Sequence, residues 1–144
     1  MTIISHPLKI SAALSILILS LTASSAPTSE DTLKNAIESP LRNQDYAVRD
    51  SSRHPYDTLQ FFRITPSMDV LELAAGGGWY TEILAPYLKD SGTLTVSHYN
   101  PEAGEYFKRS RDAYDQKVSL NPLFKGVSVV TGEVPPTKAY VAPA

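Results

Sequence analysis

Three consecutive glycines at positions 76–78 follow an apolar run that contains one acid, Glu72. A glycine turn between a strand and a helix lets backbone N–H groups approach an anionic group at the start of the helix. The dinucleotide fingerprint fails, because Trp79 stands where its third glycine would fall when the motif is counted from Ala74. No Lys-Ser or Lys-Thr pair follows, which excludes a P-loop. The turn is therefore predicted either to contact another small ligand or only to let strand and helix pack closely.

Other reactive side chains are few. The chain has no cysteine, which excludes a disulfide framework, a thiolate metal site and a cysteine nucleophile. Its three histidines, His6, His54 and His98, are too scattered to predict a metal site. His54 precedes a proline and is interpreted as a helix-start residue, and His98 has no visible partner. No catalytic residue and no metal is assigned.

Composition and charge limit the class of protein. The 144 residues, 42% hydrophobic and 19% charged, are typical of one globular domain. A formal net charge of −2 gives no general attraction to nucleic acid, so no nucleic-acid partner is expected.

The elements that must position the glycine turn alternate between strand and helix. Strand patterns occupy residues 68–73, 93–97 and 127–130, and helix patterns occupy 79–88 and 101–116. This alternation predicts an α/β fold with parallel strands and right-handed crossovers. About three strands with flanking helices correspond to the N-terminal half of a Rossmann-like, doubly wound sheet.

The first 26 residues have the order of a secretory signal peptide. Lys9 precedes an apolar run at 10–21, and small residues at 22–26 lead to Pro27. The expected mature chain begins near Pro27 and is periplasmic or secreted, without stable membrane insertion after cleavage. A retained anchor and a buried helix are the alternatives.

Residues 27–66 are predicted to form a helical segment ahead of the sheet. A helix begins at Thr28 or Ser29, a second begins at Pro55, and an exposed loop or ragged helix lies at 43–53. At the other end, residues 134–144 contain three prolines and are predicted to be extended or disordered.

Residues 70–78, Val-Leu-Glu-Leu-Ala-Ala-Gly-Gly-Gly, resemble the first motif of class I S-adenosylmethionine-dependent methyltransferases. Arg53-His54-Pro55, Thr58-Leu59, Phe61-Phe62 and the Trp-Tyr-Thr-Glu helix at 79–88 extend the resemblance. They are similar to predicted bacterial methyltransferases that carry an export signal. The resemblance covers about residues 45–132, and residues 67–133 are expected to form a partial S-adenosylmethionine-binding domain.

The resemblance implies roles for the first strand and turn. Gly76 and Gly78 would lie under the amino-acid part of S-adenosylmethionine. Glu72 would orient the turn or reach the amino group of the ligand, the alternative being a solvated turn residue. Ala74 replaces the first glycine of the family, a replacement that an extended backbone tolerates.

Two further positions correspond to ligand contacts of the family after the second and third strands. Asn100 stands where an acid grips the ribose hydroxyls, although it is also placed to cap the following helix. Glu133 would be the polar residue that meets the adenine.

The function expected from this resemblance is that of a methyltransferase-like protein with S-adenosylmethionine as cofactor and an unknown acceptor. The family pattern continues through strands 4 to 7, and this sequence stops before strand 4. Methyl transfer by the chain alone is therefore expected to be undetectable. An exported, non-enzymatic module that binds a small ligand, and a non-functional fragment, are the alternatives.

Overall fold

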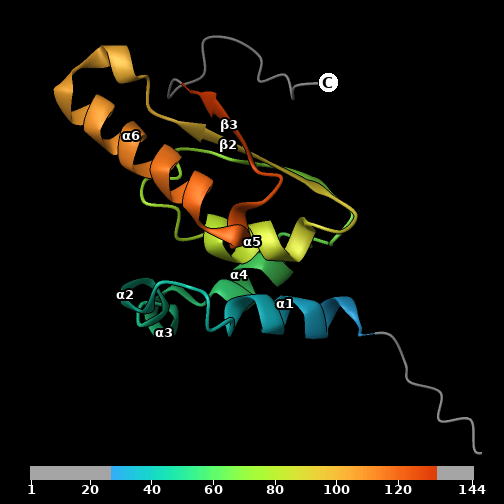
Figure 1. Cartoon of the computed structure of the whole chain (residues 1–144). Coiled ribbons are helices and arrows are strands. Elements are labelled where there is room, and N and C mark those ends of the chain that lie inside the picture. The colour runs from blue at the N-terminus through green and yellow to red at the C-terminus, as the bar shows by residue number, and fades with distance from the viewer. Residues whose placement is uncertain (1–26, 133–144) are drawn as a thin grey trace, which may run out of the picture.

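The computed structural model describes residues 27–132 as an α/β fold in which helices flank a parallel sheet (Figure 1). The predicted signal peptide at 1–26, Glu133 and the tail at 134–144 lie outside the described residues. The sheet has the order β1-β2-β3, with β1 at Asp69–Glu72, β2 at Thr93–His98 and β3 at Ser128–Thr131. Both pairings are parallel, which confirms the predicted half of a Rossmann-like sheet.

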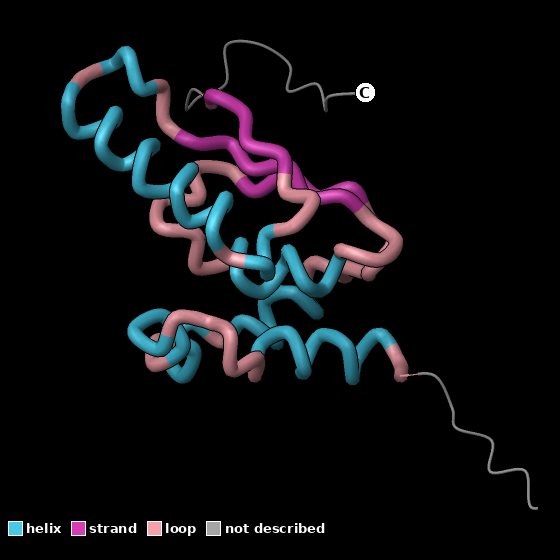
Figure 2. Tube along the Cα trace, viewed as in Figure 1, coloured by secondary structure: helices cyan, strands magenta, loops and turns pink. Residues whose placement is uncertain are grey.

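Helical crossovers connect the strands along the chain, and Figure 2 shows these helices in cyan outside the magenta sheet. The connecting elements are α5 (Thr81–Leu88), η1 (Pro101–Ala103), α6 (Glu105–Leu120) and η2 (Pro122–Phe124). Val70 pairs in register with Leu94, and Val96 pairs with Val129. This register brings the carboxyl ends of all three strands to one edge of the sheet, where the glycine turn also lies.

Helix α5 is buried on almost every side. The sequence predicts one apolar face, but every residue of α5 except Pro86 is buried. The reason is that α5 contacts β2 and also α1 (Ser29–Ile37), which forms a further layer (Figure 1). The resulting core includes Leu33 of α1 and Ile83 of α5, both fully buried.

The N-terminal segment forms the predicted helices. Helix α1 begins after Thr28, whose hydroxyl accepts the Asp31 N–H at 3.2 Å while the Asp31 carboxylate accepts the Thr28 N–H at 3.1 Å. This reciprocal capping box satisfies two backbone donors. The other helices of the segment are α2 (Gln44–Ala47), α3 (Asp50–Arg53) and α4 (Pro55–Phe61).

The stretch predicted as a loop or ragged helix forms two short helices, and a partly buried ion pair holds them. Arg42 is 3% exposed, and its guanidinium lies 2.5 and 3.0 Å from the two carboxylate oxygens of Asp50. A bidentate pair of this kind fixes geometry strongly, and it orders the chain between α1 and α3.

Across residues 27–132, no helix combines the length and apolar character needed to cross a membrane.

Candidate functional site

A cavity of about 380 Å³ lies at the carboxyl edge of the sheet. Its walls come from the residues that end or follow each strand, together with the start of α6. They are Ala74, Ser97, His98, Tyr99, Asn100, Ala103, Phe107 and Gly132. In open parallel sheets, ligands bind at this edge.

The structure brings two of the predicted site residues, Ala74 and Asn100, into the wall of this cavity. Glu72, Gly76 and Gly78 do not line it and lie instead at the end of β1 and in the turn behind it. Glu133 lies outside the described residues.

The expectation that Ala74 has an extended backbone is wrong. Its φ is 52°, which places it in the left-handed region that glycine favours. The penalty for a residue with a Cβ there is about 1–2 kcal/mol. Ala74 therefore adopts the left-handed conformation that glycine would adopt in this turn, and this conformation lowers the stability of the fold.

Asn100 has a structural role that the sequence already indicates. Its Oδ1 accepts the N–H of Glu102 at 3.0 Å and so caps η1. Its amide nitrogen has no hydrogen-bond partner among residues 27–132 and lies in a half-buried side chain at the cavity. One side chain can thus cap η1 and still donate to a ligand.

The three glycines of the turn are required for different reasons. Gly76 and Gly78 have φ values of 59° and 84°. A Cβ at Gly78 would also lie 3.0 Å from the Tyr114 ring and 3.2 Å from Thr81 Oγ1. Gly77 has no left-handed φ, but a Cβ there would collide with the hydroxyl of Tyr46. The absence of a side chain at Gly77 and Gly78 therefore leaves room for Tyr46 of α2, Tyr114 of α6 and Thr81 of α5.

Glu72 is a half-buried residue that joins strand to helix rather than a solvated turn residue. Its Oε2 accepts a hydrogen bond from the Thr81 hydroxyl at 2.6 Å. Burial raises the pKa of Glu72 to about 7, against the smaller opposing effects of the Thr81 hydrogen bonds and the Lys117 charge. Among the predicted alternatives, this contact with the first residue of α5 supports a role in orienting the turn between β1 and α5.

His98 ends β2 and supports the turn from within. The imidazole is 1% exposed, its Nε2 lies 2.9 Å from the Gly76 carbonyl oxygen, and its ring centroid lies 4.6 Å from that of Tyr114. Because a carbonyl only accepts, Nε2 carries the proton. Burial lowers the pKa of His98, which favours this neutral form. The sequence could not indicate this partner, because it is a main-chain oxygen.

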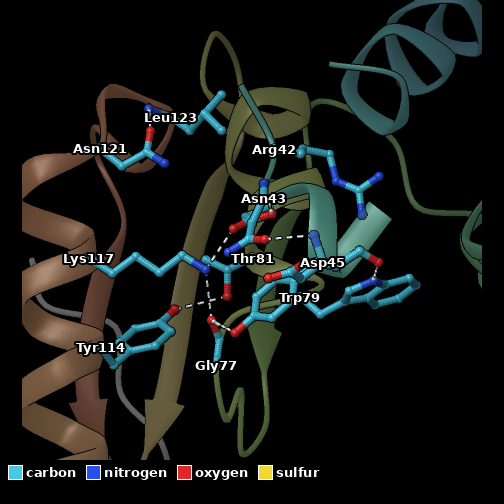
Figure 3. A network of polar contacts seen from close by, with 12 residues as sticks. Arg42, Asn43, Asp45, Gly77, Trp79, Thr81, Tyr114, Lys117, Asn121 and Leu123 are labelled. Atoms are coloured by element: carbon cyan, nitrogen blue, oxygen red, sulfur yellow. Dashed lines mark hydrogen bonds and ion pairs between the residues drawn. The ribbon is translucent and has the colours of Figure 1, made fainter. Parts of the chain in front are cut away.

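A second polar network ties the turn to α6 and to the N-terminal segment (Figure 3). The Gly77 carbonyl accepts hydrogen bonds from the Lys117 ammonium at 2.9 Å and from the Tyr46 hydroxyl at 3.1 Å. Lys117 Nζ also lies 2.6 Å from Glu82 Oε1, and the Trp79 indole donates to the Tyr46 carbonyl at 2.8 Å. Sequence reasoning missed Tyr46, Glu82 and Lys117, because they meet only in the folded chain.

Within the described part of the chain, no group of three or more His, Cys, Asp or Glu side chains could hold a metal ion. Searches against protein-family models, curated proteins and solved structures found no match to this chain. The geometry of the cavity and of the turn behind it is therefore the basis for assigning a function.

Proposed function

We propose that this protein binds S-adenosylmethionine in the cavity at the carboxyl edge of its sheet, as a methyltransferase-like protein. The observation that carries the proposal is that one cavity is lined by residues following β1, β2 and β3 together. A nucleoside with an extended substituent is a ligand that spans several adjacent strand ends in folds of this class.

The lining offers different chemistry to different parts of that ligand. The amide nitrogen of Asn100 would donate to a ribose hydroxyl, which an uncharged amide binds less strongly than a carboxylate does. Tyr99 and Phe107, whose ring centroids are 5.3 Å apart, give an aromatic wall for the adenine. Ala74, next to the glycine turn, would face the amino-acid part.

The proposal concerns binding, with the methyl acceptor unassigned. No lining residue is Asp, Glu, Lys or Arg, and the His98 Nε2 proton is already engaged by Gly76. Because the described lining supplies no charged side chain to strengthen binding, we expect weak affinity for S-adenosylmethionine.

Calorimetric titration of the purified protein with S-adenosylmethionine tests the proposal. Gly76→Val should abolish binding, because a branched side chain would enter the turn at a left-handed φ. Gly126→Val is the matched control, since Gly126 also has a left-handed φ of 89° and open space around it but precedes β3, at the opposite edge of the sheet from the glycine turn.

A second matched pair tests the ribose contact. Asn100→Ala should weaken binding about fivefold, the equivalent of roughly 1 kcal/mol for one neutral hydrogen bond. Asn121→Ala should not, although Asn121 caps η2 just as Asn100 caps η1, with its Oδ1 2.9 Å from the Leu123 nitrogen. A folded protein that binds nothing at millimolar ligand would reject the proposal in favour of a module for another ligand.

We also propose that the protein is exported and that its mature form begins near Pro27. The support is the order of Lys9, the apolar run at 10–21 and the small residues before Pro27. N-terminal sequencing of protein from the periplasm or medium tests this, and Met1 intact on cytosolic protein would contradict it.

A further inference from the structure

A second cavity lies at the amino edge of the sheet, opposite the cavity proposed for S-adenosylmethionine. Its volume is about 530 Å³, and three segments that are distant in the sequence form its walls: the connection between α1 and α2, the end of α5, and the stretch from η2 to β3. Lys89 precedes β2 and Gly126 precedes β3, which places this amino-edge cavity where two parallel strands begin. A smaller cavity of about 110 Å³ adjoins it, with Lys89, Lys125 and Gly126 in the walls of both.

Four side chains without a hydrogen-bonding group line the amino-edge cavity, namely Leu41, Pro86, Pro122 and Leu123. Pro86 is the only residue of α5 that is not buried, and Leu41 is 61% exposed. These side chains therefore still have apolar surface that a ligand can cover. Covering it removes apolar area from water, which favours the binding of an apolar group.

The charged residues that line the same cavity carry an excess of positive charge. They are Lys89, Asp90 and Lys125, in a protein whose formal net charge is −2. Lys89 Nζ lies 3.9 Å from Asp90 Oδ2, and both side chains are largely exposed. One cation of the lining therefore has no acid in the same lining to balance it.

That cation, Lys125, also has no carboxylate partner elsewhere within residues 27–132. Every other lysine in this range pairs with a carboxylate, and these are Lys34, Lys89, Lys108 and Lys117. The N–H of Gly126, the next residue, has no hydrogen-bond partner in the described part of the chain. An unpaired ammonium thus lines an otherwise largely apolar cavity, next to an unpaired backbone donor.

We propose that the amino-edge cavity binds a small amphiphilic carboxylate, with the carboxylate at Lys125 and Lys89 and the apolar chain against the leucine and proline side chains. An inorganic anion would leave those side chains in water, and an uncharged apolar molecule would leave Lys125 without a counter-ion. This site is independent of the one proposed for S-adenosylmethionine, which lies at the opposite edge of the sheet and has no charged lining residue.

Titration of the purified protein with octanoate tests the proposal. Octan-1-ol, which keeps the chain and lacks the carboxylate, and inorganic phosphate, which is an anion without a chain, are the control ligands. The amide ¹H–¹⁵N signals of Leu41, Lys125 and Gly126 are followed at low ionic strength, because salt screens exposed charges. We expect saturable shifts of these signals at millimolar octanoate, about fivefold weaker binding of octan-1-ol, and no saturation with phosphate in the same range.

Three substitutions test the charged contact. Lys125→Gln should weaken octanoate binding about threefold, because it removes the ammonium and keeps most of the side chain. Lys108→Gln is the matched control, since it changes the net charge equally at an exposed position of α6 that does not line the cavity. Asp90→Asn should tighten binding about twofold, because it removes the one acid of the lining.

Leu41→Ala tests the apolar contact. It should weaken octanoate binding about threefold, because it removes apolar surface that the chain of the ligand would cover. Val48→Ala is the control, since Val48 is 73% exposed in the same N-terminal segment and does not line the cavity. Both side chains are exposed, so circular dichroism should show that both variants keep the fold of the parent.

The outcomes that would overturn the proposal are distinct. Octan-1-ol that binds as tightly as octanoate, or equal affinities of Lys125→Gln and Lys108→Gln, would exclude the charged contact. Phosphate that matches octanoate, or equal affinities of Leu41→Ala and Val48→Ala, would exclude the apolar contact. Shifts that rise linearly with octanoate and never saturate would show that there is no site. S-adenosylmethionine takes no part in these measurements, so they leave the proposed function untouched.

Discussion

The hydroxyl of Thr81 lies 2.6 Å from Glu72 Oε2 and 2.9 Å from the Tyr114 hydroxyl. Since Thr81 donates its one proton to Glu72, Tyr114 must donate to Thr81. Burial raises the pKa of Tyr114, so its phenol keeps that proton. One chain of hydrogen bonds therefore links the last residue of β1, the first residue of α5 and the inner face of α6.

The raised pKa of Glu72 in this hydrogen-bonded chain predicts that the stability of the protein depends on pH. The folded pKa of about 7 exceeds the ordinary value of 4.5, so the folded state binds a proton that the unfolded state releases. Stability from this group is therefore lost as the pH rises from 4.5 to 7, by up to about 3 kcal/mol. Urea unfolding of the parent and of Glu72→Gln at pH 5 and pH 8 measures the effect.

Glu72→Gln should approach the parent in stability at pH 5 and exceed it at pH 8, because the amide oxygen still accepts from Thr81 and never ionises. His98 contributes in the opposite direction, because its pKa is lowered and its contribution to stability is lost as the pH falls. This contribution is the same in both proteins, so it cancels when their free energies of unfolding are subtracted. If the free energies of unfolding of Glu72→Gln and the parent differ by the same amount at pH 5 and pH 8, the pKa of Glu72 is not raised.

Ala74→Gly should stabilise the protein by about 0.5 kcal/mol. The gain is the relief of the left-handed strain at Ala74, reduced by the extra freedom of glycine in the unfolded chain. Ala113→Gly, at an exposed position within α6, should instead destabilise by about 1 kcal/mol. Chemical denaturation of both variants measures this, and two changes of the same sign would refute the strain at Ala74.

Gly92→Ala should destabilise the protein by about 1–3 kcal/mol, the usual range for overpacking. Its Cβ would lie 2.6 Å from the Pro66 carbonyl oxygen and closer still to that of Met68, and these backbone atoms cannot rotate away. Gly126→Ala serves as the comparison, because its Cβ would meet nothing within 4 Å and only its φ is unfavourable. If thermal unfolding shows a smaller loss of stability for Gly92→Ala than for Gly126→Ala, the close contact of the added Cβ with the Pro66 and Met68 carbonyls is refuted.

Gly77→Ala and Tyr46→Phe should be coupled. A Cβ added at Gly77 would collide with the Tyr46 hydroxyl, whereas the nearest ring carbon lies 3.1 Å away. Removing the hydroxyl relieves most of the collision, so Gly77→Ala should be less destabilising in the Tyr46→Phe background, by about 1 kcal/mol. A double-mutant cycle measures this, and additive effects would show that the turn yields to the methyl group instead.

The sequence predicted the parts of the fold that depend on local pattern. The capping residues around Thr28, the proline that opens α4 and the three strand patterns each depend on neighbours within a few positions. The boundaries differ by a few residues: α6, for example, runs four residues beyond the predicted end at 116.

What the sequence could not predict depends on residues that are distant along the chain. Glu82 and Lys117 look like solvated charges until α5 and α6 are packed together, and Tyr46 meets the turn only once the N-terminal segment has docked. The backbone of Ala74 is another case, because the turn as a whole imposes its left-handed conformation against the preference of the residue itself.

The burial of Trp79 gives the protein a built-in optical probe. It is the only tryptophan of the chain, is 5% exposed, and donates its indole N–H to the Tyr46 carbonyl. The guanidinium groups of Arg42 and Arg53 lie 5.8 and 5.0 Å from its ring centroid. Its fluorescence therefore reports on the contact between the N-terminal segment and the glycine turn. Emission that shifts to the red before helical circular dichroism is lost would reveal local undocking of that segment.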